Sequence, residues 1–297
     1  MTITRSVYGL ILGPVLGLLA WASVARAEIS VVDNHGRTVT VSKPAERIVS
    51  LAPHVTENLF SAGAGDQVVG VVSYSNFPQA AQSIASVGSY VRLNLEAIVA
   101  LKPDLIVAWG SGNGKGRVQS LLDLGLNVYV SEPKSLETVA KNIENYGILS
   151  GHEAEAKQVT REYLKTLYRL RESYSDRERV SVFYQVWNNP LQSVNGKGLI
   201  SDVIRLCGGY NVFADAIASA PKVTVESVLA MNPQSIVASG MGEARPEWLD
   251  EWRQWSSLQA VQGEHLYFIP PEYLQRHTVR VLTGADMLCQ NLEKVRQ

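Results

Sequence analysis

One segment of this 297-residue chain occurs twice, and this repeat constrains the fold more than any other feature. Residues 94–112, NLEAIVALKPDLIVAWGSG, align without a gap with residues 224–242, TVESVLAMNPQSIVASGMG, 130 positions further along. Each copy reads as a helix N-cap, a short helix, a proline that ends it, a buried strand and a glycine-rich turn. A period of 130 residues is too long for a solenoid. The sequence therefore predicts two similar α/β lobes.

Short apolar runs alternate with helical patterns in both halves of the chain, after an N-terminal hairpin that is expected at residues 29–41. In the first half, strands are expected at 48–51, 68–72, 105–108 and 128–130, and helices at about 54–62, 95–101, 116–124 and 135–149. In the second half, strands are expected near 180–186, 236–239 and 266–269, and helices near 199–206, 225–231 and 275–294. Such alternation is typical of parallel sheets, so each lobe should contain one.

A long amphipathic helix is predicted between the lobes, from His152 to about Tyr174. Apolar residues recur there every three or four positions, and neither glycine nor proline interrupts the pattern. About 23 residues of α-helix span roughly 35 Å, enough for a stiff strut rather than a hinge. We therefore divide the chain into an N-terminal lobe over 28–145, a linker helix within 146–177 and a C-terminal lobe over 178–297.

The first 27 residues are typical of a secretory signal peptide. Arg5 is followed by an apolar run from Val7 to Ala22, and the A-x-A sequence ending at Ala27 predicts cleavage there. An uncleaved membrane anchor is the alternative, but the run is shorter than the ~20 residues that span a bilayer. No cysteine lies near residue 27, so we expect a periplasmic protein without a lipid anchor. Export makes ATP- or NAD-driven chemistry improbable.

Charge and cysteine content narrow the function further. The formal net charge is −1, and without a basic excess a nucleic-acid partner is not expected. Export places Cys207 and Cys289 in an oxidising compartment, where an even number of cysteines favours a disulfide. Two separate buried thiols are the alternative.

Ligands of parallel sheets bind beyond the carboxyl ends of the strands, and ligands also favour domain interfaces. The turns at these strand ends and before the first repeated helix carry aromatic and polar side chains: Pro53, His54, Tyr74, Tyr90, Trp109, Trp187, Glu272, Tyr273, Gln275 and Arg276. Aromatic rings with sparse polar groups suit a large, partly apolar ligand that also forms hydrogen bonds. The alternative is that several of these rings belong to the core.

Motifs of enzymes are not found in the sequence. There is no HExxH pair, no Cys/His cluster and no G-x-S-x-G turn, and the glycine-rich run at 110–116 has the wrong spacing for a phosphate-binding loop. We therefore expect neither catalysis nor a resident metal site. His54 could ligate cobalt or haem iron as an axial ligand, or it could be a turn histidine that caps the next helix.

Two longer motifs, GRTVTVSKPAERIVSLAP and NLEAIVALKPDLIV, resemble periplasmic substrate-binding proteins of the helical-backbone class, which serve iron-siderophore, haem and cobalamin ABC importers. Within that class, VVSYSNFP, AWGSGN, ISDVIRLCGGYNVF and EYLQR resemble cobalamin-binding proteins. The resemblance implies two Rossmann-like lobes with a ligand cleft between them, joined by one long rigid helix. It also implies a transported cobalamin and no cofactor.

Particular residues match the motifs of that class. Tyr74 matches a tyrosine that packs on the corrin ring, and residues 272–276, which include Leu274, match a cobalamin-contacting loop. Cys207 and Cys289 match the disulfide of the class. Glu96 and Glu226 match paired glutamates that dock a monomeric binding protein onto an inner-membrane ABC permease dimer with its ATPase. A haem or ferric-siderophore carrier is the alternative, and a periplasmic metal-dependent enzyme is a more remote one.

Overall fold

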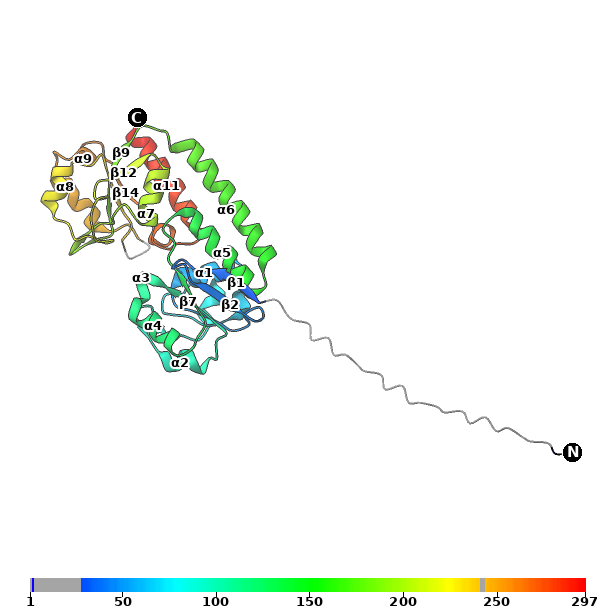
Figure 1. Cartoon of the computed structure of the whole chain (residues 1–297). Coiled ribbons are helices and arrows are strands. Elements are labelled where there is room, and N and C mark those ends of the chain that lie inside the picture. Colours follow the sequence, from blue (N-terminus) through cyan, green and yellow to red (C-terminus); the bar gives the residue numbers. More distant parts are fainter. Residues whose placement is uncertain (1, 3–27, 241–243) are drawn as a thin grey trace.

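Two lobes and one long connecting helix make up the protein, as a computed structural model shows (Figure 1). The structure describes Thr2, residues 28–240 and residues 244–297. The predicted signal peptide, apart from Thr2, and its cleavage site lie outside the described residues. The connecting helix is α6 (Glu153–Tyr174), which runs along one side of the molecule from the N-terminal lobe to the far end of the C-terminal lobe.

Each lobe contains a four-stranded sheet in which all neighbouring strands are parallel. The N-terminal sheet has the order β4-β3-β7-β8 and consists of β3 (Ile48–Ser50), β4 (Val68–Gly70), β7 (Leu105–Trp109) and β8 (Val128–Ser131). The C-terminal sheet has the order β12-β9-β13-β14 and consists of β9 (Val180–Gln185), β12 (Gly209–Asn211), β13 (Ser235–Ala238) and β14 (Leu266–Phe268). Both sheets thus place their four strands in the spatial order second, first, third, fourth.

The sequence repeat occupies the same place in both lobes. Its first copy forms α2 (Leu95–Ala100) and β7, and its second copy forms α8 (Val225–Met231) and β13. Asn94 and Thr224 cap the two helices, because their side chains accept hydrogen bonds from the backbone N–H groups of Ala97 and Ser227. The predicted α/β fold with two similar lobes is confirmed.

The remaining elements surround the two sheets. The helices are α1 (Pro53–Ser61), α3 (Gly110–Asn113), α4 (Lys115–Asp123), α5 (Leu136–Ser150), α7 (Leu199–Leu206), α9 (Gln259–Gln262), α10 (Pro271–Leu274) and α11 (Val281–Val295). Three 3₁₀ helices lie at Gly65–Gln67, Gln79–Ser83 and Glu247–Gln254. Three antiparallel pairs are β1 (Ile29–Val32) with β2 (Thr38–Val41), β5 (Gly88–Ser89) with β6 (Arg92–Leu93), and β10 (Trp187–Asn188) with β11 (Leu191–Gln192).

Some sequence-based expectations differ from the structure in detail. The helix expected from residue 275 begins at Val281, because Pro270 and Pro271 start the separate short helix α10. The helix expected at 135–149 is α5, which ends at Ser150 before Gly151, a glycine in the left-handed conformation, and the long helix α6 begins only at Glu153. Strand β12 was not expected, because its sequence GYN carries no periodic apolar signal.

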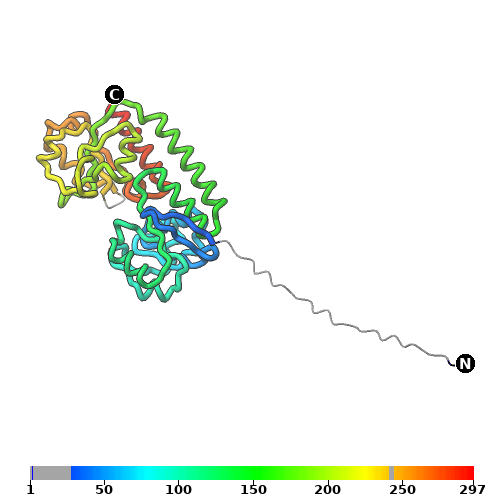
Figure 2. The backbone as a smooth tube through the Cα atoms, viewed as in Figure 1, coloured from blue at the N-terminus to red at the C-terminus, as the bar shows by residue number. Residues whose placement is uncertain are grey.

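The hydrophobic core is continuous from one lobe to the other. It includes Ile48 of β3, Tyr146 of α5, Leu167 of α6 and Leu288 of α11, all fully buried. Figure 2 shows α5 and α11 beside α6 along the chain trace, and contacts between these helices join the lobes. Within the part of the chain that the structure describes, no helix is long and apolar enough to cross a membrane.

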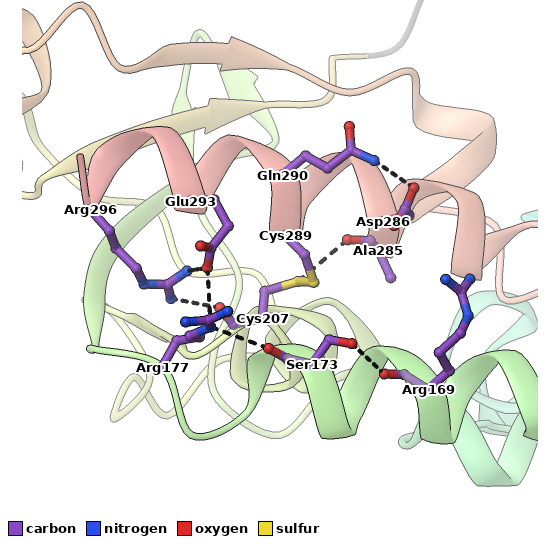
Figure 3. The surroundings of a disulfide bond; sticks show 10 residues. All are labelled: Arg169, Ser173, Arg177, Cys207, Ala285, Asp286, Cys289, Gln290, Glu293 and Arg296. Atoms are coloured by element: carbon purple, nitrogen blue, oxygen red, sulfur yellow. Dashed lines mark hydrogen bonds and ion pairs between the residues drawn. A yellow bond between two sulfur atoms is a disulfide. The ribbon is translucent and has the colours of Figure 1, made fainter.

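Cys207 and Cys289 form a disulfide between the end of α7 and α11, with their Cα atoms 4.6 Å apart. Figure 3 shows that polar contacts lie beside the bridge. Arg296 donates to the carbonyl oxygen of Cys207 at 2.8 Å and pairs with Glu293 at 2.6 Å. The bridge and these contacts fasten α11 to the C-terminal lobe, and the predicted pairing is confirmed.

Candidate ligand-binding site

Two of the predicted site residues, His54 and Trp109, lie together with His277 where the two lobes meet. His54 stands in the first turn of α1, directly after β3, and Trp109 is the last residue of β7. The ring of His54 lies 5.1 Å from that of Trp109 and 5.4 Å from that of His277, measured between centroids. His277 follows β14 and α10 in the C-terminal lobe. The carboxyl ends of the two sheets therefore face each other, as expected for this topology.

Three nitrogen atoms in this ring cluster are buried and have no hydrogen-bond partner among the described residues: Nε2 of His54, Nδ1 of His277 and Nε1 of Trp109. Burial lowers the pKa of His54 well below its usual value, and the nearby His277 and Arg276 lower it further. Burial alone lowers the pKa of His277 to about 4. Both imidazoles are thus neutral near pH 7, and the cluster offers polar groups without charge.

A buried ion pair joins the lobes beside this cluster. Glu57 of α1 is 1% exposed, and both of its oxygens accept hydrogen bonds from Arg280, at 2.6 and 2.7 Å. Arg276 approaches the same carboxylate at 4.0 Å. Asn58, next in α1, donates to the carbonyl oxygen of His277 at 2.8 Å. Glu57, Asn58 and Arg280 were not predicted, and the available signal was a carboxylate and an amide side by side in the helix PHVTENLFS, which directly follows a buried strand.

Tyr74 stands at the edge of this junction. Its side chain is 77% exposed, and its φ of +67° is a left-handed conformation that bulky residues rarely adopt. The guanidinium of Arg276, from the other lobe, donates to the carbonyl oxygen of Tyr74 at 3.2 Å. An exposed aromatic ring held in an unfavourable backbone conformation is a feature of functional sites.

The other predicted aromatic residues are distributed over both lobes. Tyr90 packs on Trp109, with ring centroids 5.6 Å apart. Asn113 fixes both of these residues, because its side chain bonds to the backbone of Tyr90 and of Trp109. Trp187 lies in the C-terminal lobe on the β10–β11 hairpin, where its indole donates to the carbonyl oxygen of Asn189. The structure gives no ring contact between Trp187 and the N-terminal rings.

Residues 272–276 follow β14 at the carboxyl edge of the C-terminal sheet. Glu272 and Tyr273 are half-buried, and Gln275 donates to the carbonyl oxygen of Gly240 at 2.7 Å. The side chain of Leu274 is fully buried in the core, so only its backbone is available for a ligand. Pro53 is half-buried and begins α1. Among the described residues, no group of three or more His, Cys, Asp and Glu side chains could hold a metal ion.

Glu96 and Glu226 are exposed in the first turns of α2 and α8, at matching places in the two lobes. Their backbone setting favours a negative charge, because the N-terminus of a helix is positive. Hydrogen bonds from its own backbone N–H and from Thr224 lower the pKa of Glu226, so this carboxylate stays ionised near neutral pH. The two lobes thus display one acid each in equivalent positions.

Comparison with known proteins agrees with this architecture. Residues 48–273 match the periplasmic binding protein family, and the chain belongs to that family. It is 34% identical to a vitamin B12-binding protein of Vibrio campbellii, over 86% of this chain and 92% of that one. It is 36% identical to a vitamin B12-binding protein of Vibrio cholerae, over 84% of this chain and 90% of the relative.

Solved structures give the same picture. The crystal structure of the periplasmic vitamin B12 binding protein BtuF of Vibrio cholerae matches with a TM-score of 0.80 and 35% identity, covering 86% of this chain and 99% of that chain. The periplasmic haem-binding protein HutB of Vibrio cholerae matches with a TM-score of 0.71 at 20% identity, which shows the shared fold alone. The resemblance seen in the sequence motifs is confirmed, and the relatives named here are binding proteins, not enzymes.

Proposed function

We propose that this chain is the substrate-binding component of a cobalamin ABC importer. The observation that carries the proposal is its match, at 34–36% identity and over most of its length, to proteins named for binding vitamin B12. After signal-peptide cleavage the chain would act in the periplasm as a monomer, and cobalamin is its transported ligand rather than a resident cofactor. The site residues described above fit a large ring system with a polar rim.

Each part of the site has a role in this proposal. Tyr74 offers an exposed aromatic face to one side of the corrin ring. Trp187, on β10 of the other lobe, adds a second aromatic surface for the ring. Corrin carries amide side chains around its edge, and Arg276, Gln275 and Glu272 can form hydrogen bonds with them. Aromatic surface supplies most of the apolar contact, while the few polar groups fix the orientation.

His54 packs edge-on against the ring of Trp109 and helps to hold that ring in place. Its side chain is 4% exposed and lies between the rings of Trp109 and His277. An axial bond to cobalt would require the imidazole to leave that place. We therefore assign the cobalt no protein ligand from the described residues.

Delivery to the membrane is proposed to use Glu96 and Glu226. The two acids are exposed at equivalent positions on two similar lobes, which suits a permease built as a two-fold dimer. Arginines of the permease dimer, which carries its own ATPase, would pair with them.

Calorimetric titration of the protein from Glu28 onward tests the ligand, with cyanocobalamin, haemin and a ferric hydroxamate as probes. We expect saturation at one cyanocobalamin per chain and no binding of the other two. The variant Y74A should bind cyanocobalamin about five- to 150-fold more weakly, since stacking of a planar ring on one aromatic side chain contributes about 1–3 kcal/mol, as measured for nucleobases. The control is Y168A, which removes a tyrosine that is 52% exposed on α6. Binding of haemin or the hydroxamate instead of cyanocobalamin would overturn the proposal.

A further inference from the structure

Glu57 is a buried carboxylate whose basic partners come from the opposite lobe. Its side chain is 1% exposed. Guanidinium nitrogens of Arg280 lie 2.6 and 2.7 Å from its two carboxylate oxygens, and one of Arg276 lies 4.0 Å away. A buried charge is costly unless it is paired and hydrogen-bonded. The position of the two arginines is therefore tied to Glu57, and with it the position of the segment between α10 and α11.

Both guanidinium groups also contact the N-terminal loop at residues 73–78. Arg276 donates to the carbonyl oxygen of Tyr74 at 3.2 Å. The guanidinium carbon of Arg280 lies 4.1 Å from the centroid of the Phe77 ring, a cation–π distance. The loop that carries Tyr74 is thus held by the same two side chains that pair with Glu57.

The backbone of Tyr74 needs such support. Its φ of +67° is unfavourable for a residue with a side chain, and such conformations persist only where surrounding contacts impose them. The carbonyl group of Tyr74 is directed to Arg276 in this conformation. Without that bond, a φ in the ordinary negative range would be favoured, and the exposed ring would change direction.

We propose that Glu57 is a positioning residue for the ligand site. Through Arg276 and Arg280, it fixes the conformation of Tyr74 and directs the tyrosine ring before a ligand arrives. Preorganisation of this kind strengthens binding because less ordering remains to be done on association. The identity of the ligand rests on the function proposed above, whereas the positioning of the loop does not.

The first test needs no ligand. Hydrogen exchange is measured by mass spectrometry on peptides that cover residues 73–78, in the wild type and in E57Q. The control is D33N, because Asp33 is also a buried carboxylate bound by an arginine, Arg37, but that pair lies within the N-terminal hairpin. E57Q should accelerate exchange in the loop several-fold, and D33N should leave the loop unchanged. Unchanged exchange in E57Q, or equal acceleration in both variants, would overturn the proposal.

The second test measures whether Glu57 and Tyr74 depend on each other in their effect on ligand affinity. Affinity for cyanocobalamin is determined for wild type, E57Q, Y74A and the double variant. E57Q alone should weaken binding on the order of tenfold, and most of this effect should disappear when Tyr74 is already absent. Additive losses would show that Glu57 does not act on affinity through Tyr74, against the proposal. If the wild type does not bind cyanocobalamin, the proposed function fails, and the exchange experiment still decides the positioning role.

A second variant covers the case in which E57Q does not fold. R276Q leaves the Glu57–Arg280 pair in place and removes the hydrogen bond to the carbonyl oxygen of Tyr74. It should accelerate exchange in residues 73–78 while the peptide covering α11 exchanges as in the wild type. Protection of the loop in R276Q equal to that in the wild type would contradict the proposal.

Discussion

Glu57 and Arg280 form a bidentate ion pair between the lobes, with Arg280 Nε 2.6 Å from Oε1 and its terminal nitrogen 2.7 Å from Oε2. The two residues are 223 positions apart in the sequence. The hydrogen bonds to Glu57 raise the pKa of Arg280 above its ordinary value. This pair joins the lobes in addition to the covalent path through α6, together with the Asn58–His277 and Arg276–Tyr74 hydrogen bonds and the shared core.

Replacement of Arg280 by methionine should therefore destabilise the whole protein. The carboxylate of Glu57 would remain buried without its main partner, and breaking such a pair typically costs about 3–5 kcal/mol. Urea unfolding at pH 7, followed by tryptophan fluorescence, measures the change. The control is R253M, which breaks an exposed pair with Asp250 and should cost less than about 1 kcal/mol. A similarly small loss for both variants would contradict the role of Arg280.

Removal of the disulfide should lower stability without weakening ligand binding. The bridge closes a loop with a sequence separation of 82, and such a constraint contributes about 2–4 kcal/mol, mainly by restricting the unfolded chain. The double variant C207A/C289A is compared with the wild type in urea, with and without reductant. Reductant should destabilise the wild type alone. A loss of cyanocobalamin affinity in the variant would show that the bridge also shapes the site.

Stability should fall as the pH drops from about 6.5 towards 4. In the folded protein the pKa of His277 is lowered to about 4, and that of His54 lies well below its usual value, whereas both take up protons near pH 6.5 when unfolded. The unfolded state thus binds more protons in this window, so stability is complete above about pH 6.5. Each histidine can contribute a slope of up to about 1.4 kcal/mol per pH unit below it.

Urea unfolding of H277Q between pH 4.5 and 7.5 checks this dependence. The variant should show a shallower loss of stability below pH 6.5 than the wild type, because one of the two linked protonations is absent. A slope in H277Q equal to that of the wild type would mean that other groups control the acid sensitivity.

Charge reversal at both Glu96 and Glu226 should abolish docking and leave ligand binding intact. The two carboxylates are exposed, and they lie in the first turns of α2 and α8, two helices that contain none of the predicted ligand-binding residues. Binding of E96R/E226R to its permease in nanodiscs, and its affinity for cyanocobalamin, are measured in parallel. E153R, a reversal in the first turn of α6, is the control and should dock as the wild type does. Normal docking of E96R/E226R would show that Glu96 and Glu226 are not needed for binding to the permease.

The repeat made the fold predictable. Helix α2 and strand β7 recur as α8 and β13 because local signals, namely caps, apolar periodicity and a proline stop, dictate both copies. Strand β12 was missed for the opposite reason. It is three residues long and owes its place to pairing with β9, which no local pattern reveals.

The site was predictable only in part. Residues at strand ends, such as His54 and Trp109, follow from topology, and the structure does bring them together. Glu57 and Arg280 did not follow, because the reason for a buried carboxylate in α1 lies in a partner far along the chain. The burial of Leu274 likewise depends on packing beneath α10, which a short motif does not determine.

Helix α6 has a consequence for transport. Its 22 residues form one uninterrupted helix between the lobes. The Glu57–Arg280 ion pair also holds the two lobes together. A continuous helix and an ion pair between the lobes resist hinge motion. We therefore expect the protein to have nearly the same overall shape with and without its ligand. A permease that recognised only the shape of the protein would bind the ligand-free and the ligand-bound forms equally well. We therefore expect productive recognition to depend on the bound ligand, as a part of the surface that the permease contacts.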